Sequence, residues 1–311
     1  MSTSGTYTFT MTRDDIIKAA LRQVGAYETG QAVDAALITD TAQALNILTK
    51  AMQTTLGGLW AITNITVFLN TTSSSYLVGP TGATATVDDV TQTSIATAAL
   101  NGAGSVTVAS ASGLALGMYI GIQMDDGTQF WTTITNVVGA VVSLNANLPT
   151  TSAAANNVFA YTNVAQRPLD ILEARRRDVN GTDVTLIVGN RDDYEQLSVK
   201  KSSGSITQVY YQPLLGNGKL HVWPMSSNAT DRILMSAKIP FQDFDTMTDN
   251  AYFPVEALRM LKWGLAEELM IEWDCNPQKC KMISEMAGKA KAEFSFYDTE
   301  VSFNFAPEFR R

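Results

Sequence analysis

One break in the pattern of charges constrains the organisation of this chain more than any other feature. No Lys or Arg occurs between Lys50 and Arg167, although the 311-residue chain holds 22 of them. The acids of that stretch are limited to Asp88, Asp89, Asp125 and Asp126. Thr, Ser, Ala, Gly and Val dominate it, and ordinary charged composition returns on both sides. Because such changes in composition accompany domain boundaries, we expect an inserted domain here.

Short strand-like runs separated by turns fill the neutral stretch. Met118–Met124 and Gln129–Val138 flank Asp125-Asp126-Gly127, a sequence typical of a hairpin turn. Further runs of the same character are Ser105–Ala109, Val141–Leu144 and Val158–Tyr161. Short strands at this spacing predict a small all-β barrel or sandwich over residues 80–163.

The charged flanks begin and end with predicted helices. Thr12 with an acid three residues later has the form of a capping box and opens the first helix. A longer helix is predicted over about 32–54 from its apolar stripe. Two further helices close the charged region, one after Pro254 and one after Asn276-Pro277, since Pro is favoured in the first turn of a helix.

Between the insert and the last helices, the pattern returns to strands and turns. Leu169–Arg177 and Val184–Val188 flank a turn, and Gln208–Gln212 and Lys219–Trp223 read as a second hairpin. We therefore expect an α+β fold. Its discontinuous core domain (1–79 and 164–294) has four main helices plus antiparallel β hairpins, and it carries the inserted β domain (80–163) and an extended C-terminal tail (295–311).

Composition limits the partners of the chain. The formal net charge of −8 disfavours a protein that grips DNA, because affinity for nucleic acid comes mainly from Lys and Arg neutralising phosphates. Charged residues are only 17% of the chain, and surface that is neither charged nor buried is often interface. We expect no secretory signal in Met1–Met11, which lacks a basic and an apolar segment, and no membrane span.

Residues that could support catalysis or bind a metal do not combine into a known site. His221 is the single histidine and has no neighbouring nucleophile motif. The paired carboxylates are Glu267/Glu268, Asp192/Asp193 and Asp125/Asp126, which read as a helix surface, a helix start and a turn. Gly102-Ala103-Gly104 lacks the Lys of a phosphate loop. Cys275 and Cys280 have no further ligand nearby for zinc, and we expect two reduced thiols.

These observations favour a protein that is not an enzyme, with no catalytic residue, no cofactor and no metal. Two segments remain as candidate binding residues. Arg175-Arg176-Arg177 is the strongest local charge feature, and it fits either an anion contact or inter-subunit salt bridge, or the exposed end of a strand. In the tail, Val301, Phe303, Phe305 and Phe309 follow a strand-like alternation without an adjacent partner strand. Such a segment either folds back or docks on another chain.

Four stretches of the charged flanks resemble the head-to-tail adaptor family of short-tailed, podovirus-like bacteriophages, also described as tail accessory or packaged-DNA stabilisation proteins. They are the helix pair Thr12–Met52 running into Gly58-Leu59-Trp60; Leu172–Asp178 with Asn180-Gly181-Thr182-Asp183; Asn190–Tyr194 followed by Tyr210-Tyr211 and Val222-Trp223-Pro224; and the link Asp243-Phe244 to Phe253-Pro254 with Leu265–Leu269 beyond. The neutral insert departs from the compact members of that family.

The resemblance implies a virion protein at the head–tail junction, made in the cytoplasm of a host bacterium. It implies a homo-oligomeric, dodecameric ring beneath the portal protein that extends the DNA channel and passes DNA during ejection without sequence-specific binding. It further implies a lower face for the next component, a tail tube or nozzle protein or a tail fibre, and a C-terminal extension that binds the portal.

Three alternative functions are compatible with the sequence. The β insert could make the chain a carbohydrate-binding or adhesin-like protein, with Tyr119, Phe130 and Trp131 as a stacking platform. A hydrolase of cell-wall polymer would place its acid at Glu268. Another ring, stopper or tail-tube component would share the composition without being the adaptor.

Overall fold

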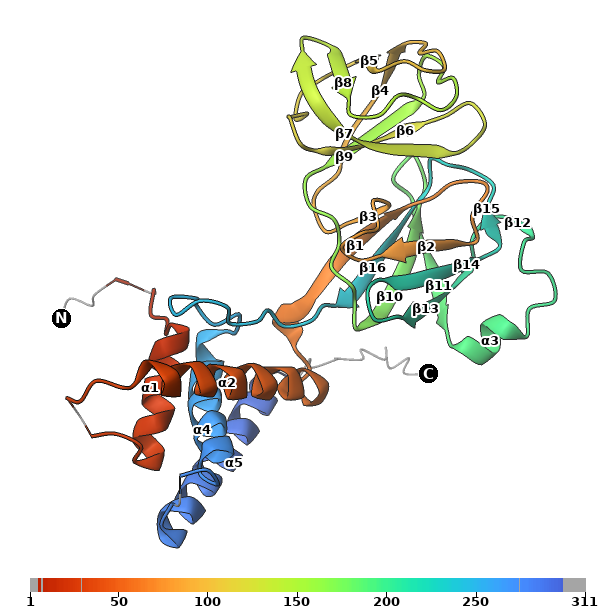
Figure 1. The fold of residues 1–311 in the computed structure, drawn as a ribbon. Coiled ribbons are helices and arrows are strands. Elements are labelled where there is room, and N and C mark those ends of the chain that lie inside the picture. Colours follow the sequence, from red (N-terminus) through yellow and green to blue (C-terminus); the bar gives the residue numbers. More distant parts are fainter. Residues whose placement is uncertain (1–4, 7, 29, 274, 299–311) are drawn as a thin grey trace. The chain divides into compact units, whose positions relative to one another are not determined.

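The computed structural model describes residues 5, 6, 8–28, 30–273 and 275–298. The chain divides into two units, Met1–Ala61 with Pro240–Arg311, and Ile62–Ile239. In the described residues the first unit is helical and the second is built mainly of strands (Figure 1).

The helical unit is organised around one central helix. Its elements are α1 (Arg13–Val24), α2 (Ala35–Thr55), η1 (Leu59–Ala61), η2 (Val255–Ala257), α4 (Leu258–Leu269) and α5 (Pro277–Tyr297). The central helix α4 packs against α1, α2 and α5, and buries Leu261 and Leu265 completely. The predicted capping box at Thr12 is confirmed, because its hydroxyl accepts the N–H of Asp15 while the Asp15 carboxylate accepts the N–H of Thr12.

An aromatic group closes the helical unit beside the end of α2. The Trp60 ring stacks on Phe241 with ring centroids 5.2 Å apart, and also contacts Phe253 and Phe294 at 5.5 Å each. The indole N–H of Trp60 donates to the carbonyl of Tyr252 at 3.2 Å. The half-buried Trp60 side chain is thereby both packed and hydrogen-bonded, which satisfies the polar end of the indole.

The strand-built unit contains an eight-stranded sheet. Its strands, in spatial order, are β2 (Ser75–Val78), β14 (Gly218–Trp223), β13 (Gln208–Pro213), β11 (Asp183–Gly189), β10 (Asp170–Arg177), β16 (Arg232–Lys238), β1 (Ile62–Phe68) and β3 (Ala85–Thr86). All neighbours are antiparallel except β11 and β13, which are parallel. The side chains of one face, among them Ile65, Val67, Leu220 and Ile233, form a single buried core with those of the other strands.

Small elements complete this part of the chain. The short helix α3 (Arg191–Glu195) follows β11, and β12 (Ser203–Gly204) pairs with β15 (Met225–Ser226). The predicted second hairpin is confirmed as β13 and β14, whose register runs from Gln208 opposite Trp223 to Pro213 opposite Gly218. Gly218 is required there, because a Cβ at that position would lie 2.0 Å from the Tyr211 hydroxyl.

A closed six-stranded barrel lies within the same unit. Its strands close in the order β4 (Thr91–Thr97), β5 (Ser105–Val108), β8 (Val141–Leu144), β7 (Gln129–Val138), β6 (Tyr119–Gln123) and β9 (Asn157–Tyr161). Its interior is filled by Ile95, Ile120, Ile122 and Val142 with ten further buried residues. A separate aromatic cluster of Phe68, Phe159 and Tyr161 joins barrel and sheet, because Phe68 belongs to β1 and the other two to β9.

The predicted fold class is wrong. The chain is mostly β, and four helices with accessory hairpins do not form its core. The expected hairpins form, but β10 and β11 belong to the same sheet as β16 and β1. The buried face of that sheet forms a hydrophobic core of its own. Local patterning could not show this, because β1 finds its partner β16 only at the far end of the strand region.

The end of α5 differs from the sequence-based expectation. The final helix continues to Tyr297, beyond Ser295, where we expected the tail to begin. Among the described residues, no helix combines the length and apolar character needed to cross a membrane.

Candidate functional site

The arginine run lies on β10, and strand geometry separates its three side chains. Side chains alternate between the two faces of a strand. Arg175 lies opposite Leu234 and Thr185 on the outer face, whereas Arg176 lies opposite Ile233, which belongs to the buried inner face. Arg177 returns to the outer face. The run therefore makes one outward pair and one inward arginine, and not a single basic cluster.

The outward pair shares one carboxylate. Arg177 donates from Nε and Nη2 to the two carboxylate oxygens of Asp183, at 2.7 and 2.8 Å, which is a bidentate geometry. Arg175 Nε lies 3.3 Å from the same carboxylate. The hydrogen bonds from Arg177 lower the pKa of Asp183, and the same contact raises the pKa of Arg177. Two guanidinium groups therefore share one carboxylate, and Glu173 lies two residues before Arg175 on the same strand, beside the same groove.

The inward arginine has a structural partner. Arg176 Nε lies 3.7 Å from Asp231, and the two side chains are only 17% and 10% exposed. Burial raises the pKa of Asp231, while the attraction of Arg176 opposes that rise. Asp231 also accepts a hydrogen bond from the side-chain amide of Asn228 at 2.9 Å. This pair belongs to the packing of the sheet, and it is not available to a partner.

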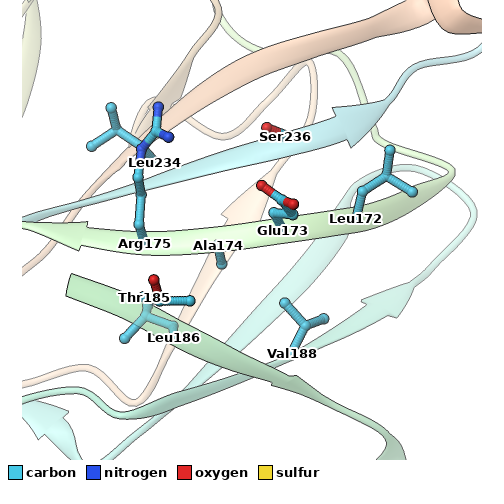
Figure 2. Close-up of a pocket in the computed structure, with 9 residues that line it drawn as sticks. All are labelled: Leu172, Glu173, Ala174, Arg175, Thr185, Leu186, Val188, Leu234 and Ser236. Atoms are coloured by element: carbon cyan, nitrogen blue, oxygen red, sulfur yellow. The ribbon is translucent and has the colours of Figure 1, made fainter. Parts of the chain in front are cut away.

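A groove opens beside Arg175 where β11 leaves β10. The β10–β11 ladder runs only from Arg177 opposite Asp183 to Ala174 opposite Leu186, and β11 then pairs with β13 from Ile187 onward. A pocket of about 450 Å³ occupies this divergence. Figure 2 shows its lining side chains on β10, β11 and β16: Leu172, Glu173, Ala174, Arg175, Thr185, Leu186, Val188, Leu234 and Ser236.

A β-bulge gives the groove its mixed character. The pairing of β10 with β16 shifts between Ile171 and Glu173, so Leu172 and Glu173 are both exposed while Ile171 and Ala174 are buried. Leu172 is 48% exposed, and Val188 across the groove is 37% exposed. Exposed apolar groups beside a charged pair are typical of a surface that binds another protein.

The other candidate residues have structural roles in this fold. His221 stacks on Tyr210 with centroids 5.5 Å apart, and its Nε2 lies 3.4 Å from Gln212 Oε1. Asp193 caps α3 by accepting the N–H of Asn190. The carboxylate of Asp125 accepts hydrogen bonds from Thr151, Ala153 and Asn156, and those bonds lower its pKa.

Cys275, Cys280 and Glu267 make local hydrogen bonds. Cys275 and Cys280 are not joined in a disulfide, and the Cys280 thiol donates to the Cys275 carbonyl at 3.2 Å. Glu267 accepts the hydroxyl of Ser284 at 2.7 Å. The described part of the chain contains no group of three or more His, Cys, Asp or Glu residues that could hold a metal ion. Val301, Phe303, Phe305 and Phe309 lie outside the described residues.

The aromatic residues expected to form a stacking platform on the insert are packed. The Tyr119 ring stacks on Tyr161 at 5.3 Å, and Trp131 lies 4.7 Å from Phe68. Phe130 packs against the barrel core. Sequence reasoning missed Asp183, Asp231 and Arg232 as partners of the arginine run. Asp183 could have been found, because a hairpin around Asn180-Gly181 places it opposite Arg177.

Comparisons with known proteins give little further information. No protein-family model and no curated protein matches the chain. Among solved structures, the Gp54 tailspike of Acinetobacter baumannii bacteriophage AP22, in complex with A. baumannii capsular saccharide, matches with a TM-score of 0.22 and 17% identity over 25% of this chain. The match spans 16% of the tailspike chain. VP17, a capsid protein of bacteriophage P23-77, matches with a TM-score of 0.12 and 10% identity, over 63% of this chain and 75% of its own. At these TM-scores neither likeness carries an argument about this chain.

Proposed function

We propose that this chain is a structural protein of a bacteriophage particle and, within that class, a head-to-tail adaptor. It forms a ring beneath the portal, extends the DNA channel and offers a surface to the next tail component. The proposal starts from the residues that resemble the adaptor family. In the structure most of these residues lie on α1, α2 and α4, on the β10–β11 hairpin, and on α3 with the β13–β14 hairpin. Gly58-Leu59-Trp60 and the link from Asp243 to Pro254 lie outside those elements, and none of the residues lies in the barrel.

The observation that carries the proposal is the outer face of β10 and β11. It presents the Arg175–Asp183–Arg177 group beside a groove that exposes the apolar side chains of Leu172 and Val188. A ring needs a heterologous interface, in which one surface of each copy binds a different surface of the next. A face that combines exposed apolar side chains with an arginine–carboxylate group suits such an interface, because charged groups beside an apolar patch set the register of binding.

The charge balance supports the channel role. A protein that must let DNA slide has to avoid many Lys and Arg contacts to phosphate, because each such contact adds affinity. With 22 basic residues against 30 acidic ones, the chain has little capacity to hold DNA. We expect no measurable binding of duplex DNA by the free protein at physiological salt.

Electron microscopy of the purified chain, alone and mixed with the portal protein of the same virus, tests the proposal. We expect rings of uniform size bound coaxially to the portal. Changing Arg175 and Arg177 together to Ala should impair ring formation, whereas Arg191→Ala on α3 serves as the matched control. Normal rings from the double variant would remove the proposed interface, and a chain that never associates with the portal would contradict the adaptor role.

A further inference from the structure

Arg232 is a half-buried arginine for which the described residues supply no carboxylate. It begins β16 on the outer face, opposite Arg177 on β10 and Phe68 on β1. Its guanidinium carbon lies 5.2 Å from the centroid of the Phe159 ring, and Nη2 donates to Gln92 Oε1 at a long 3.4 Å. A guanidinium normally finds a bidentate anion when it leaves water, because partial desolvation without a counter-charge is costly.

The charges around Arg232 increase this imbalance. Arg175 and Arg177 share the carboxylate of Asp183, whereas no carboxylate among the described residues forms an ion pair with Arg232. Burial, and then repulsion by Arg177, lower the pKa of Arg232. An added anion at this point would be attracted by all three arginines.

A pocket of about 460 Å³ lies over these side chains. Asn64, Thr66 and Gln92 add polar groups to its wall, and Leu234 adds an apolar patch. Figure 1 places the strands concerned, β1, β10 and β16, side by side in the sheet, and β4 supplies Gln92 from the barrel. The pocket therefore combines charge, hydrogen-bonding groups and enough room for a small organic group.

Two acids at the edge of the pocket restrict the ligand. Asp88 directs its carboxylate at the backbone N–H groups of Thr162 and Asn163, at 3.0 and 2.6 Å, and at the Asn163 side chain at 3.1 Å. Its charge is thus offset locally, whereas Asp89 is exposed. Because Asp88, Asp89 and Asp183 together offset the charge of the three arginines, a second negative charge on the ligand gains little, and binding depends on parallel hydrogen bonds from the planar guanidinium, which match a carboxylate. This favours a carboxylate over a phosphate.

From this arrangement we infer that the pocket formed by Arg175, Arg177 and Arg232 is a binding site for a carboxylate group, with Arg232 as its main ligand-binding residue. The carboxylate comes either from a protein side chain or from a free organic acid. The inference goes beyond the adaptor proposal and does not depend on it.

The test is a titration of the full chain with sodium acetate and, separately, with N-acetylglutamate amide, at low chloride concentration. Arginine side-chain Nε–H signals in NMR spectra report binding. We expect saturable shifts of the Arg232 signal in the millimolar range. Tighter binding of N-acetylglutamate amide than of acetate assigns the ligand to a protein side chain, and the reverse order assigns it to a free organic acid. No saturable shift with either compound overturns the inference.

Variants make the assignment specific. Arg232→Gln should weaken acetate binding by about tenfold or more, which is the expected loss for a charged hydrogen bond, and Arg191→Gln should leave it unchanged. Because Arg232 also packs on Phe159, a thermal melt checks that the variant is folded. Should it unfold, Asn64→Leu retains all three arginines and alters only the wall, and it should still weaken binding. Binding that persists unchanged in both variants would contradict the site.

Discussion

The carboxylate of Asp298 accepts the backbone N–H of Gly58 at 2.7 Å and that of Leu59 at 2.9 Å, so the residue that ends α5 is fixed to the turn that ends α2. Asp298 is buried, and Gly57 packs so closely that a Cβ there would lie 2.6 Å from the Asp298 carbonyl oxygen. Gly58 has a φ of 67°, a conformation that glycine adopts without strain. The Gly57-Gly58 pair is therefore explained by the acid that it contacts.

Asp298→Ala should destabilise the helical unit. The change leaves two N–H groups without an acceptor, one of them in a buried contact, and the expected loss in the free energy of unfolding is about 2 kcal/mol or more. Urea denaturation followed by far-ultraviolet circular dichroism measures it. The matched control is Glu293→Ala, which breaks only an exposed pair with Arg259 and should cost less than about 1 kcal/mol. Equal stability of the two variants would show that the Asp298 contacts contribute little.

Substitutions of the three arginines of β10 should affect the stability of the subunit and the formation of rings to different extents. Arg176→Ala leaves Asp231 buried with only Asn228 as its partner, and should lower the free energy of unfolding by roughly 1–3 kcal/mol. Arg175→Ala and Arg177→Ala remove side chains that are 43% and 35% exposed, and should each cost less than about 1 kcal/mol. Ring formation should show the opposite order, with the larger defect in the outward pair. A stability loss as large for Arg177→Ala as for Arg176→Ala would contradict this ranking.

His221 should titrate below its ordinary pKa of 6.5, because burial and then the nearby charge of Lys219 lower its pKa, although Glu195 opposes the shift. A depressed pKa means that the folded state binds the proton less readily than the unfolded state. The associated stability is therefore present above pH 6.5 and is lost as the pH falls through the folded-state pKa. Because His221 is the single histidine of the chain, its imidazole signal can be followed in an NMR titration without another histidine signal. His221→Gln should remove this part of the pH dependence of the free energy of unfolding. A midpoint at or above 6.5 would contradict the prediction.

The stabilisation that Asp183 gains from its arginine partner should also depend on pH. The hydrogen bonds from Arg177 hold its pKa below the ordinary 3.8, so the stabilisation by this pair is present above pH 3.8 and is lost as the pH falls through the lower folded-state pKa. A carboxyl-detected NMR titration should give a midpoint below 3.8 in the native chain. The midpoint should move upward in Arg177→Gln and stay in place in Arg191→Gln. An unchanged Asp183 titration in Arg177→Gln would show that another group sets it.

The parts of the fold that the sequence predicted are those set by neighbouring residues. Thr12 with Asp15 caps α1, Gly25 ends it in the left-handed conformation, and Asp125-Asp126-Gly127 turns β6 into β7. These features depend on contacts within a few residues. The eight-stranded sheet depends on which strands meet, and no local signal showed that β1 pairs with β16 or that β11 leaves β10 for β13.

The residues of the candidate site could likewise be predicted from the sequence only in part. The arginine run was visible in the sequence, and the period of two along a strand was sufficient to place Arg176 on the opposite face from Arg175 and Arg177. Arg232 gave no signal, because its proximity to Arg177 exists only through the pairing of β16 with β10. That no carboxylate of the described residues pairs with Arg232 became apparent only with the neighbouring side chains in place.

The last prediction concerns the segment after α5. The family resemblance implies that Val301, Phe303, Phe305 and Phe309 contribute to portal binding, and truncation is the direct test. A chain that ends at Asp298 retains both hydrogen bonds to the α2 turn. It should keep the native free energy of unfolding and lose portal binding in a co-sedimentation assay.

A chain that ends at Phe294 is the informative comparison, because it also removes Asp298 and the Tyr297 ring that packs 5.9 Å from Phe294. It should lose stability as well as binding, so a binding defect in this shorter chain alone would reflect a damaged helical unit. Portal binding by the chain that ends at Asp298, at the strength of the full-length protein, would contradict a role for residues 299–311. The two truncations together therefore distinguish a segment that binds the portal from one that only stabilises its own subunit.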